Sequence, residues 1–155
     1  MSFTAETYKV LAQNPKINGV KEASGNLSLI THTRCLCGDD FYIWSGNDDQ
    51  VVPMMSLGAK GVISVASNVA PKLMVNITHL CLEGRFEEAA RLQLDHMELM
   101  DALFCEVNPI PVKAALNLMG KDVGGLRLPL CDISAANLER LRAAMEKTGL
   151  LPAGQ

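Results

Sequence analysis

The sequence predicts an α/β protein in which three strand–helix units form a parallel sheet and a purely helical region follows. Strand, turn and helix patterns alternate at intervals of roughly 20 to 25 residues up to Pro71, and only helical patterns follow that proline. The chain has 155 residues, of which 48% are apolar and 20% are charged, as expected of one globular domain with a buried core. A complete (β/α)8 barrel needs about 250 residues, so this chain is too short to hold one.

The first unit begins with an apolar run that ends in a lysine. Residues 17–21 predict a buried strand whose carboxyl end is Lys21. Asn26 is a residue type that caps helices, and it predicts a helix over 27–37. A short helix over 4–13 precedes the strand and ends before a proline.

Two more apolar runs predict the remaining strands. Residues 41–44 form the second strand, and residues 62–65 form the third. Between them we expect a helix that ends near residue 57 and is capped by Asn47 or Asp48.

Amphipathic periodicity accounts for the rest of the chain. Helices are predicted over 72–82, 86–104, 112–119 and 135–148, and the second of these is one long amphipathic helix. The Asn-Pro-Ile-Pro segment at 108–111 is expected to be a rigid connector, because each proline fixes its φ angle and lacks an amide donor.

Charge and cysteine patterns exclude several classes of partner. The net charge is −3 and the basic residues are scattered, so we expect no nucleic-acid partner. The uncharged stretch 61–71 is far shorter than the roughly 20 apolar residues of a membrane span, and residues 2–6 do not resemble a signal peptide. The five cysteines have no regular spacing, as expected of reduced thiols in the cytoplasm.

Lys21 is the single residue best placed for chemistry. Ligands bind at the carboxyl ends of parallel strands, where this lysine would direct its amine. Burial there would disfavour the ammonium and free a lone pair for Schiff-base chemistry. From the pattern alone, a solvated lysine at a strand end is the more common outcome.

Other candidate sites have weaker support. The segment 45–49 can be an ordinary turn with a helix cap, or it can place backbone groups and carboxylates near a substrate. Asp48 and Asp49 lack the further ligands of a metal site, and Cys35 and Cys37 lack the second pair of a zinc site. No glycine-rich nucleotide motif occurs, so no cofactor and no metal are expected from the residues.

Several motifs carry a resemblance to a known family. They are Gly-Val-Lys-Glu-Ala-Ser-Gly-Asn at 19–26, Ser-Gly-Asn-Asp at 45–48, Gly-Val-Ile-Ser-Val-Ala-Ser-Asn-Val at 61–69, Glu-Val-Asn-Pro-Ile-Pro-Val-Lys at 106–113 and Leu-Arg-Leu-Pro-Leu at 126–130. In their order and spacing they resemble the C-terminal half of the dihydrodipicolinate synthase family.

The resemblance implies a more specific fold. The chain would be a partial (β/α)8 TIM barrel, strands six to eight, followed by a C-terminal helical region. Residues 1–83 would form the barrel portion and residues 84–155 the helical region. Strands one to five would lie before Met1, together with the family's proton-relaying tyrosines and threonine, its pyruvate-carboxylate threonine, its substrate arginine and its lysine feedback site.

The resemblance also implies an activity. Lys21 would form an imine with pyruvate, and the resulting enamine would attack aspartate semialdehyde in the diaminopimelate route to lysine. The backbone of Ile63 would contact pyruvate, and the carbonyl of Gly46 would line the same pocket. Carbonyls over 12–17 match a monovalent-cation site of some members. By resemblance to full-length members, the complete protein would be a homo-oligomer, specifically a tetramer, and would lie in the cytoplasm. This chain alone is expected to be inactive.

Two other interpretations stay open at this point. The chain can belong to a sister Schiff-base aldolase, such as N-acetylneuraminate lyase or a 2-keto-3-deoxy sugar acid aldolase, since these enzymes share the fold. It can also be a non-catalytic half-barrel that acts as an interaction module, because uncovered strand edges and apolar faces favour association.

Overall fold

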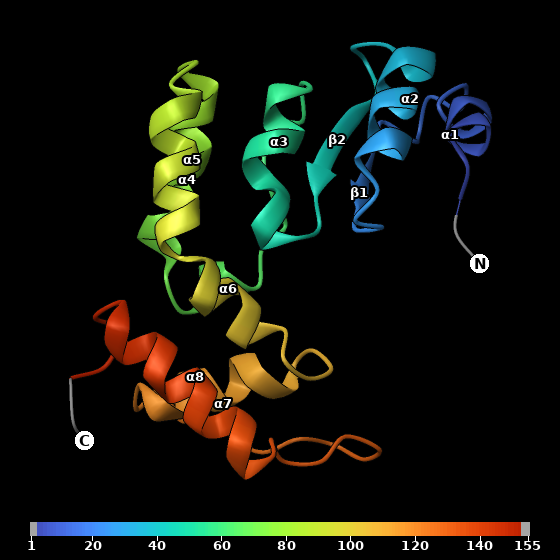
Figure 1. Ribbon diagram of the computed structural model, residues 1–155. Coiled ribbons are helices and arrows are strands. Elements are labelled where there is room, and N and C mark those ends of the chain that lie inside the picture. The colour runs from blue at the N-terminus through green and yellow to red at the C-terminus, as the bar shows by residue number, and fades with distance from the viewer. Residues whose placement is uncertain (1–2, 153–155) are drawn as a thin grey trace. The chain divides into compact units, whose positions relative to one another are not determined.

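Short strands and helices alternate in the first part of the chain, and helices alone make up the rest (Figure 1). The computed structural model describes residues 3–152. The strands are β1 (Gly19–Glu22) and β2 (Tyr42–Ser45). The α-helices are α1 (Ala5–Leu11), α2 (Leu27–Cys37), α3 (Val51–Ser56), α4 (Pro71–Leu82), α5 (Phe86–Asp95), α6 (Met97–Leu103), α7 (Ile110–Leu118) and α8 (Ala135–Lys147). The predicted α/β class is confirmed.

The chain divides into two compact units. One unit comprises the chain up to Ser64 together with Asn76–Ala90, and the other comprises Val65–Val75 and the chain from Arg91 onward. The first unit holds both strands. The boundary near residue 83, drawn between a barrel portion and a helical region, stays a prediction.

The sheet in the first unit is smaller than predicted. β1 and β2 pair in parallel, with Lys21 opposite Trp44. The predicted third strand at 62–65 is reduced to a single bridge between Ser45 and Val62. It extends no further because the backbone turns helical at the end of this segment and enters a 3₁₀ turn at 66–68.

Capping residues fix where the early helices begin. The Asn26 side chain accepts a hydrogen bond from the Leu29 amide at 3.1 Å, so the predicted cap of α2 is confirmed. The predicted helix that follows β2 instead begins as a 3₁₀ turn at Asp48–Gln50 and becomes α-helical at Val51. Asn47 precedes that turn without a capping hydrogen bond from its side chain.

Each unit has its own apolar core. In the first unit, α1 packs against α2 (Figure 1). The Tyr8 ring lies 6.3 Å from that of Phe41. Fully or nearly fully buried apolar side chains of this unit include those of Ile30, Ile43, Val51, Met54 and Met55. In the second unit, α6 and α7 both pack on α8, with Leu99, Met100, Leu103, Leu141 and Met145 buried.

The predicted long helix at 86–104 is wrong, because His96 interrupts it. In a continuous α-helix the His96 amide would donate to the carbonyl of Leu92. Instead this amide donates to Gln93 at 3.1 Å, and the His96 ring Nδ1 lies 2.8 Å from the Leu92 carbonyl oxygen. The ring therefore occupies the carbonyl oxygen that a continuous helix would use to accept from the His96 amide.

Within residues 3–152, no helix is long and apolar enough to cross a membrane.

The proline segment at 108–111 is shorter as a connector than predicted. α7 begins at Ile110, so that Pro111 lies in its first turn and is buried. A proline fits there because the first amides of a helix have no partner within it.

The carboxylate of Glu106 secures the start of α8. Its Oε1 accepts hydrogen bonds from the Ser134 amide at 3.0 Å, the Ser134 hydroxyl at 2.7 Å and the Asn137 side-chain amide at 2.8 Å. Ser134 is the predicted cap residue, yet its hydroxyl bonds this carboxylate and not its own helix. These bonds lower the pKa of Glu106, as expected of an anion at a helix N-terminus.

The lowered pKa predicts an acid-sensitive contribution to stability. The ionised Glu106 stabilises the fold above the ordinary glutamate pKa of about 4.3, and this effect is lost as the pH falls through the lower pKa of the folded state. We expect Glu106→Gln to unfold more readily than the wild type near neutral pH, with the difference shrinking in acid. Urea unfolding at several pH values measures this. Glu139→Gln, on the exposed side of α8, is the matched control, and an equal pH response in both variants would contradict the assignment.

Candidate active site

Lys21 lies near the carboxyl end of β1, at the edge where parallel strands commonly bind ligands. It is the third residue of that strand and faces Trp44 across the pair. Its side chain is exposed in this chain. Lys21 therefore lies near the end of a parallel strand, whereas residues 3–152 leave its side chain exposed.

Gly46 lies directly against the lysine stem. Its amide donates to the Glu22 carbonyl at 2.8 Å, which continues the pairing one step beyond the two strands. A Cβ placed on Gly46 would lie 2.6 Å from the Ala23 Cβ and 3.0 Å from Lys21 Cε. The absence of a side chain at this position is what lets the lysine and the following loop pass so close.

Ile63 lies at the same edge, where its backbone is hydrogen-bonded to that of Ser45. The Ile63 amide donates to the Ser45 carbonyl at 2.8 Å, and the Ser45 amide donates to Gly61 at 2.9 Å. The Ser45 hydroxyl, which is buried, donates to the Asn47 carbonyl at 2.7 Å and shapes the turn that follows β2. The three predicted site residues, Lys21, Gly46 and Ile63, thus follow one another at the ends of neighbouring segments of one unit.

Sequence reasoning missed two residues behind this edge, Glu22 and Tyr8. The Tyr8 hydroxyl donates to Glu22 Oε2 at 2.8 Å, and the Ser24 amide donates to Oε1 at 2.7 Å. Burial and this contact with Glu22 raise the pKa of Tyr8 to about 12. The alternation of faces along β1 was the available signal, since it places Glu22 on the side opposite Lys21.

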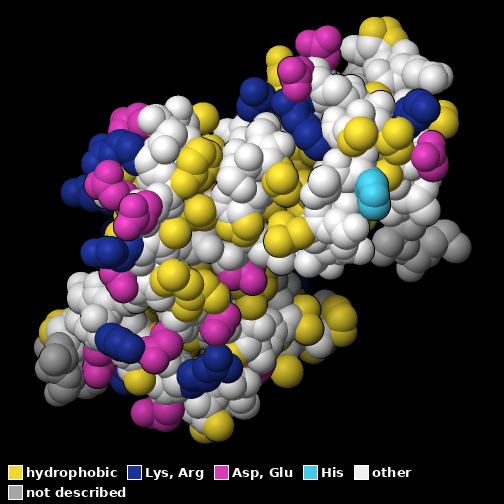
Figure 2. Space-filling model, turned by 45° about the horizontal axis from the view of Figure 1, so that its top comes forward, with side chains coloured by type: hydrophobic (Ala, Val, Ile, Leu, Met, Phe, Trp, Pro, Cys, Tyr) yellow, Lys and Arg dark blue, Asp and Glu magenta, His cyan; other side chains and the backbone are white. Residues whose placement is uncertain are grey.

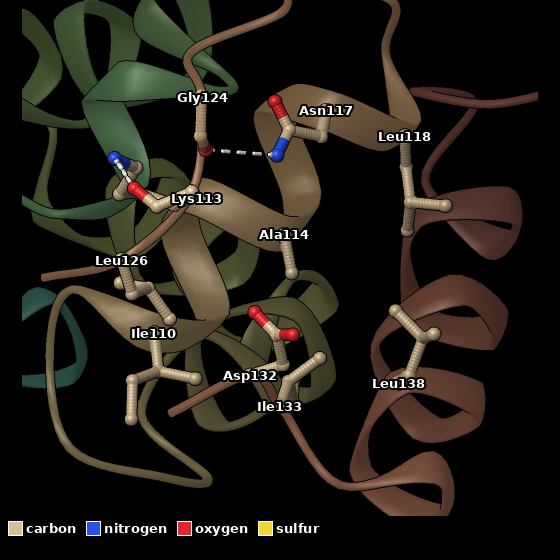
Figure 3. Close-up of a pocket in the computed structure, with 11 residues that line it drawn as sticks. Ile110, Lys113, Ala114, Asn117, Leu118, Gly124, Leu126, Asp132, Ile133 and Leu138 are labelled. Carbon is tan, nitrogen blue, oxygen red and sulfur yellow. Dashed lines mark hydrogen bonds between the residues drawn. The ribbon is translucent and has the colours of Figure 1, made fainter. Parts of the chain in front are cut away.

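The second unit contains a cavity of about 390 Å³ between α7, α8 and the loop that joins them (Figure 3). Two of its polar side chains hold that loop. The Lys113 amine donates to the Gly125 carbonyl at 2.5 Å, and the Asn117 side-chain amide donates to Gly124 at 3.3 Å. Lys113 would have to give up this bond before it could attack a carbonyl compound, so Lys21 remains the better candidate nucleophile.

Cysteine nucleophiles and metal centres have less support than the lysine. Burial raises the pKa of the Cys37, Cys81 and Cys105 thiols, which disfavours their thiolate forms. Among the described residues, no three or more His, Cys, Asp or Glu side chains gather in a group that could hold a metal ion. On the face shown in Figure 2, acidic and basic side chains are interspersed, with apolar side chains exposed among them.

The close approach at Gly46 predicts a local effect of adding one methyl group. Gly46→Ala should displace Ala23 and the Lys21 stem and lower the free energy of unfolding by about 1–3 kcal/mol, the usual cost of overpacking. Urea unfolding measures this loss. Gly125→Ala is the matched control, because nothing lies within 4 Å of a Cβ at that position. Equal stability of the two variants would show that the approach at Gly46 imposes no constraint.

Known proteins resemble this chain in both sequence and structure. The Dihydrodipicolinate synthetase family profile matches residues 1–148. The 4-hydroxy-tetrahydrodipicolinate synthase of Clostridium novyi is 49% identical over 146 residues, which are 94% of this chain and 49% of that protein. The enzyme of the same name from Thermoanaerobacter sp. strain X514 is 47% identical over 152 residues, which are 97% of this chain and 51% of that protein.

Solved structures agree with the sequence relatives. The dihydrodipicolinate synthase of Thermotoga maritima superposes with a TM-score of 0.91 at 44% identity, covering 95% of this chain and 51% of that one. The Acinetobacter baumannii enzyme, solved in complex with pyruvate, has a TM-score of 0.91 at 35% identity, covering 96% of this chain and 51% of that one. This chain spans about half the length of the curated relatives it matches. It belongs to the dihydrodipicolinate synthetase family.

Proposed function

We propose that Lys21 is the Schiff-base nucleophile of a pyruvate-dependent synthase of which this chain forms about half. The observation that carries the proposal is the position of the lysine, near the carboxyl end of a parallel strand and with its stem against Gly46. The proposed overall reaction is the condensation of pyruvate with aspartate semialdehyde in the diaminopimelate route to lysine, in the cytoplasm. The pyruvate complex of the Acinetobacter baumannii relative supports the first substrate, and the names of the relatives favour a synthase over a sister aldolase.

The proposed chemistry begins at the lysine nitrogen. The lone pair of the neutral amine attacks the carbonyl carbon of pyruvate, and loss of water gives the imine. Loss of a methyl proton then gives an enamine, whose carbon attacks the aldehyde carbon of aspartate semialdehyde. The Gly46 carbonyl and the backbone of Ile63 would line the pyruvate pocket. Acid–base groups positioned for the proton steps contribute about 10²–10⁴-fold in rate, and we place them in the remaining half of the fold.

The proposed role requires the other half of the fold. We assign β1, β2 and the bridge at Val62 to strands six to eight of a barrel. One edge of β1 is then left to pair with strand five of that barrel. Enclosure by the other strands would disfavour the charged ammonium of Lys21, now exposed, and so activate it. The complete enzyme would be a homo-oligomer, a tetramer.

Borohydride trapping tests the identity of the nucleophile. With a family N-terminal half present, pyruvate and borohydride should modify Lys21 and leave Lys21→Ala unmodified, because only an enclosed amine is largely neutral near neutral pH. Peptide mass spectrometry locates the modification. Trapping at Lys60, Lys72 or Lys113 would remove the assignment.

A coupled assay tests the dependence on the other half. This chain alone should give no measurable condensation of pyruvate with aspartate semialdehyde, since the lysine is exposed and the proposed acid–base groups lie elsewhere. Co-expression with a family N-terminal half should restore some turnover, and Lys21→Ala in the same complex should abolish it. Robust turnover by the purified 155-residue chain would contradict this account.

A further inference from the structure

Glu22 and Tyr8 form a buried pair directly behind the residue that carries the candidate amine. Successive side chains of a strand point to opposite faces, so Glu22 faces away from the side chain of Lys21. Only 5% of Glu22 and 7% of Tyr8 are exposed. The hydrogen bond between them, 2.8 Å long, joins residues 14 positions apart and ties α1 to the end of β1.

The same glutamate makes two further contacts. Its other carboxylate oxygen accepts from the Ser24 amide at 2.7 Å, which holds the loop after β1. Its backbone carbonyl accepts from the Gly46 amide at 2.8 Å, which holds the segment after β2. The end of β1 is therefore fixed by α1, by its own following loop and by the neighbouring segment.

We propose that Glu22 and Tyr8 are positioning residues for Lys21, which hold the end of β1 so that the amine emerges at one place beside Gly46. The proposal rests on the function proposed above. A one-residue slip of β1 would carry every side chain to the opposite face. A fixed strand end is thus a precondition for a fixed amine. The lysine stem runs close along the Gly46 backbone, because a Cβ built on Gly46 would lie 3.0 Å from Lys21 Cε.

The hydroxyl of Tyr8 gives the proposal a sharp test, because it can accept a hydrogen bond as well as donate one. In Glu22→Gln the new amide can donate to Tyr8 while its oxygen still accepts from Ser24. The positioning should therefore survive loss of the charge. Tyr8→Phe and Glu22→Ala instead leave buried polar groups without partners, which is costly.

The experiment follows the lysine amines of the full chain by NMR after reductive methylation with an isotope label, with resonances assigned from Lys→Arg variants. We expect Tyr8→Phe and Glu22→Ala to move the Lys21 resonance more than half of the way toward its position in the unfolded chain. Glu22→Gln should keep most of the wild-type position. Tyr42→Phe, at an exposed tyrosine of β2, is the matched control, and Lys113 in the other unit is the internal reference.

Three results would overturn the proposal. The first is a Lys21 resonance that stays unchanged in Tyr8→Phe and Glu22→Ala although the unfolding midpoints of both variants fall, which would make the pair merely structural. The second is a Glu22→Gln variant that moves the resonance as far as Glu22→Ala does, which would assign the effect to charge. The third is a common shift of all lysine resonances, that of the reference Lys113 included, which would show that the effect is not specific to Lys21. If Glu22→Ala does not fold, Tyr8→Phe and Glu22→Gln decide the matter. Pyruvate trapping at Lys21 is scored separately, so its failure would remove the proposed function while leaving the positioning result intact.

Discussion

The buried carboxylate of Glu22 is the contact on which the arrangement around Lys21 depends. A charged carboxylate can be buried only where donors satisfy it, and here the Tyr8 hydroxyl and the Ser24 amide supply one bond to each oxygen. That requirement draws α1 and the loop after β1 to the strand end. The backbone carbonyl of Glu22 adds the Gly46 amide to the same junction. One residue therefore joins three segments, immediately beside the amine that the proposed chemistry uses.

Features set by neighbours in sequence or by the regular geometry of a parallel sheet were predictable, and contacts between particular side chains of distant elements were not. The cap at Asn26 was predictable because capping involves residues within one turn. The meeting of Lys21 and Gly46 was predictable because the carboxyl ends of parallel strands lie at one edge. The partnership of Glu22 with Tyr8 was not, because nothing in a helix pattern says which strand end a residue 14 positions away will reach.

Two of the predicted elements differ from the structure for different physical reasons. Periodicity over 86–104 is truly amphipathic, but one side chain, His96, competes for a backbone acceptor and ends the helix. The apolar run at 62–65 is a good strand sequence, yet a strand exists only as far as its partner pairs with it, and here the pairing stops after one bridge. Periodicity measures which face is apolar; it does not measure competition for a hydrogen bond or the length of a shared edge.

The proposed reaction makes two requirements of Lys21, position and activation, and the chain separates them. Position comes from contacts that this chain makes internally: the register of β1 with β2, the close approach at Gly46 and the anchoring of Glu22. Activation comes from enclosure, which disfavours the ammonium, and the exposed Lys21 shows that these contacts do not provide it. Glu22 and Tyr8 lie behind the strand, on the face away from the Lys21 side chain, whereas the residues that would enclose the amine must lie in front. A nucleophile can therefore be held in place by one half of a fold and still depend on the other half for its reactivity.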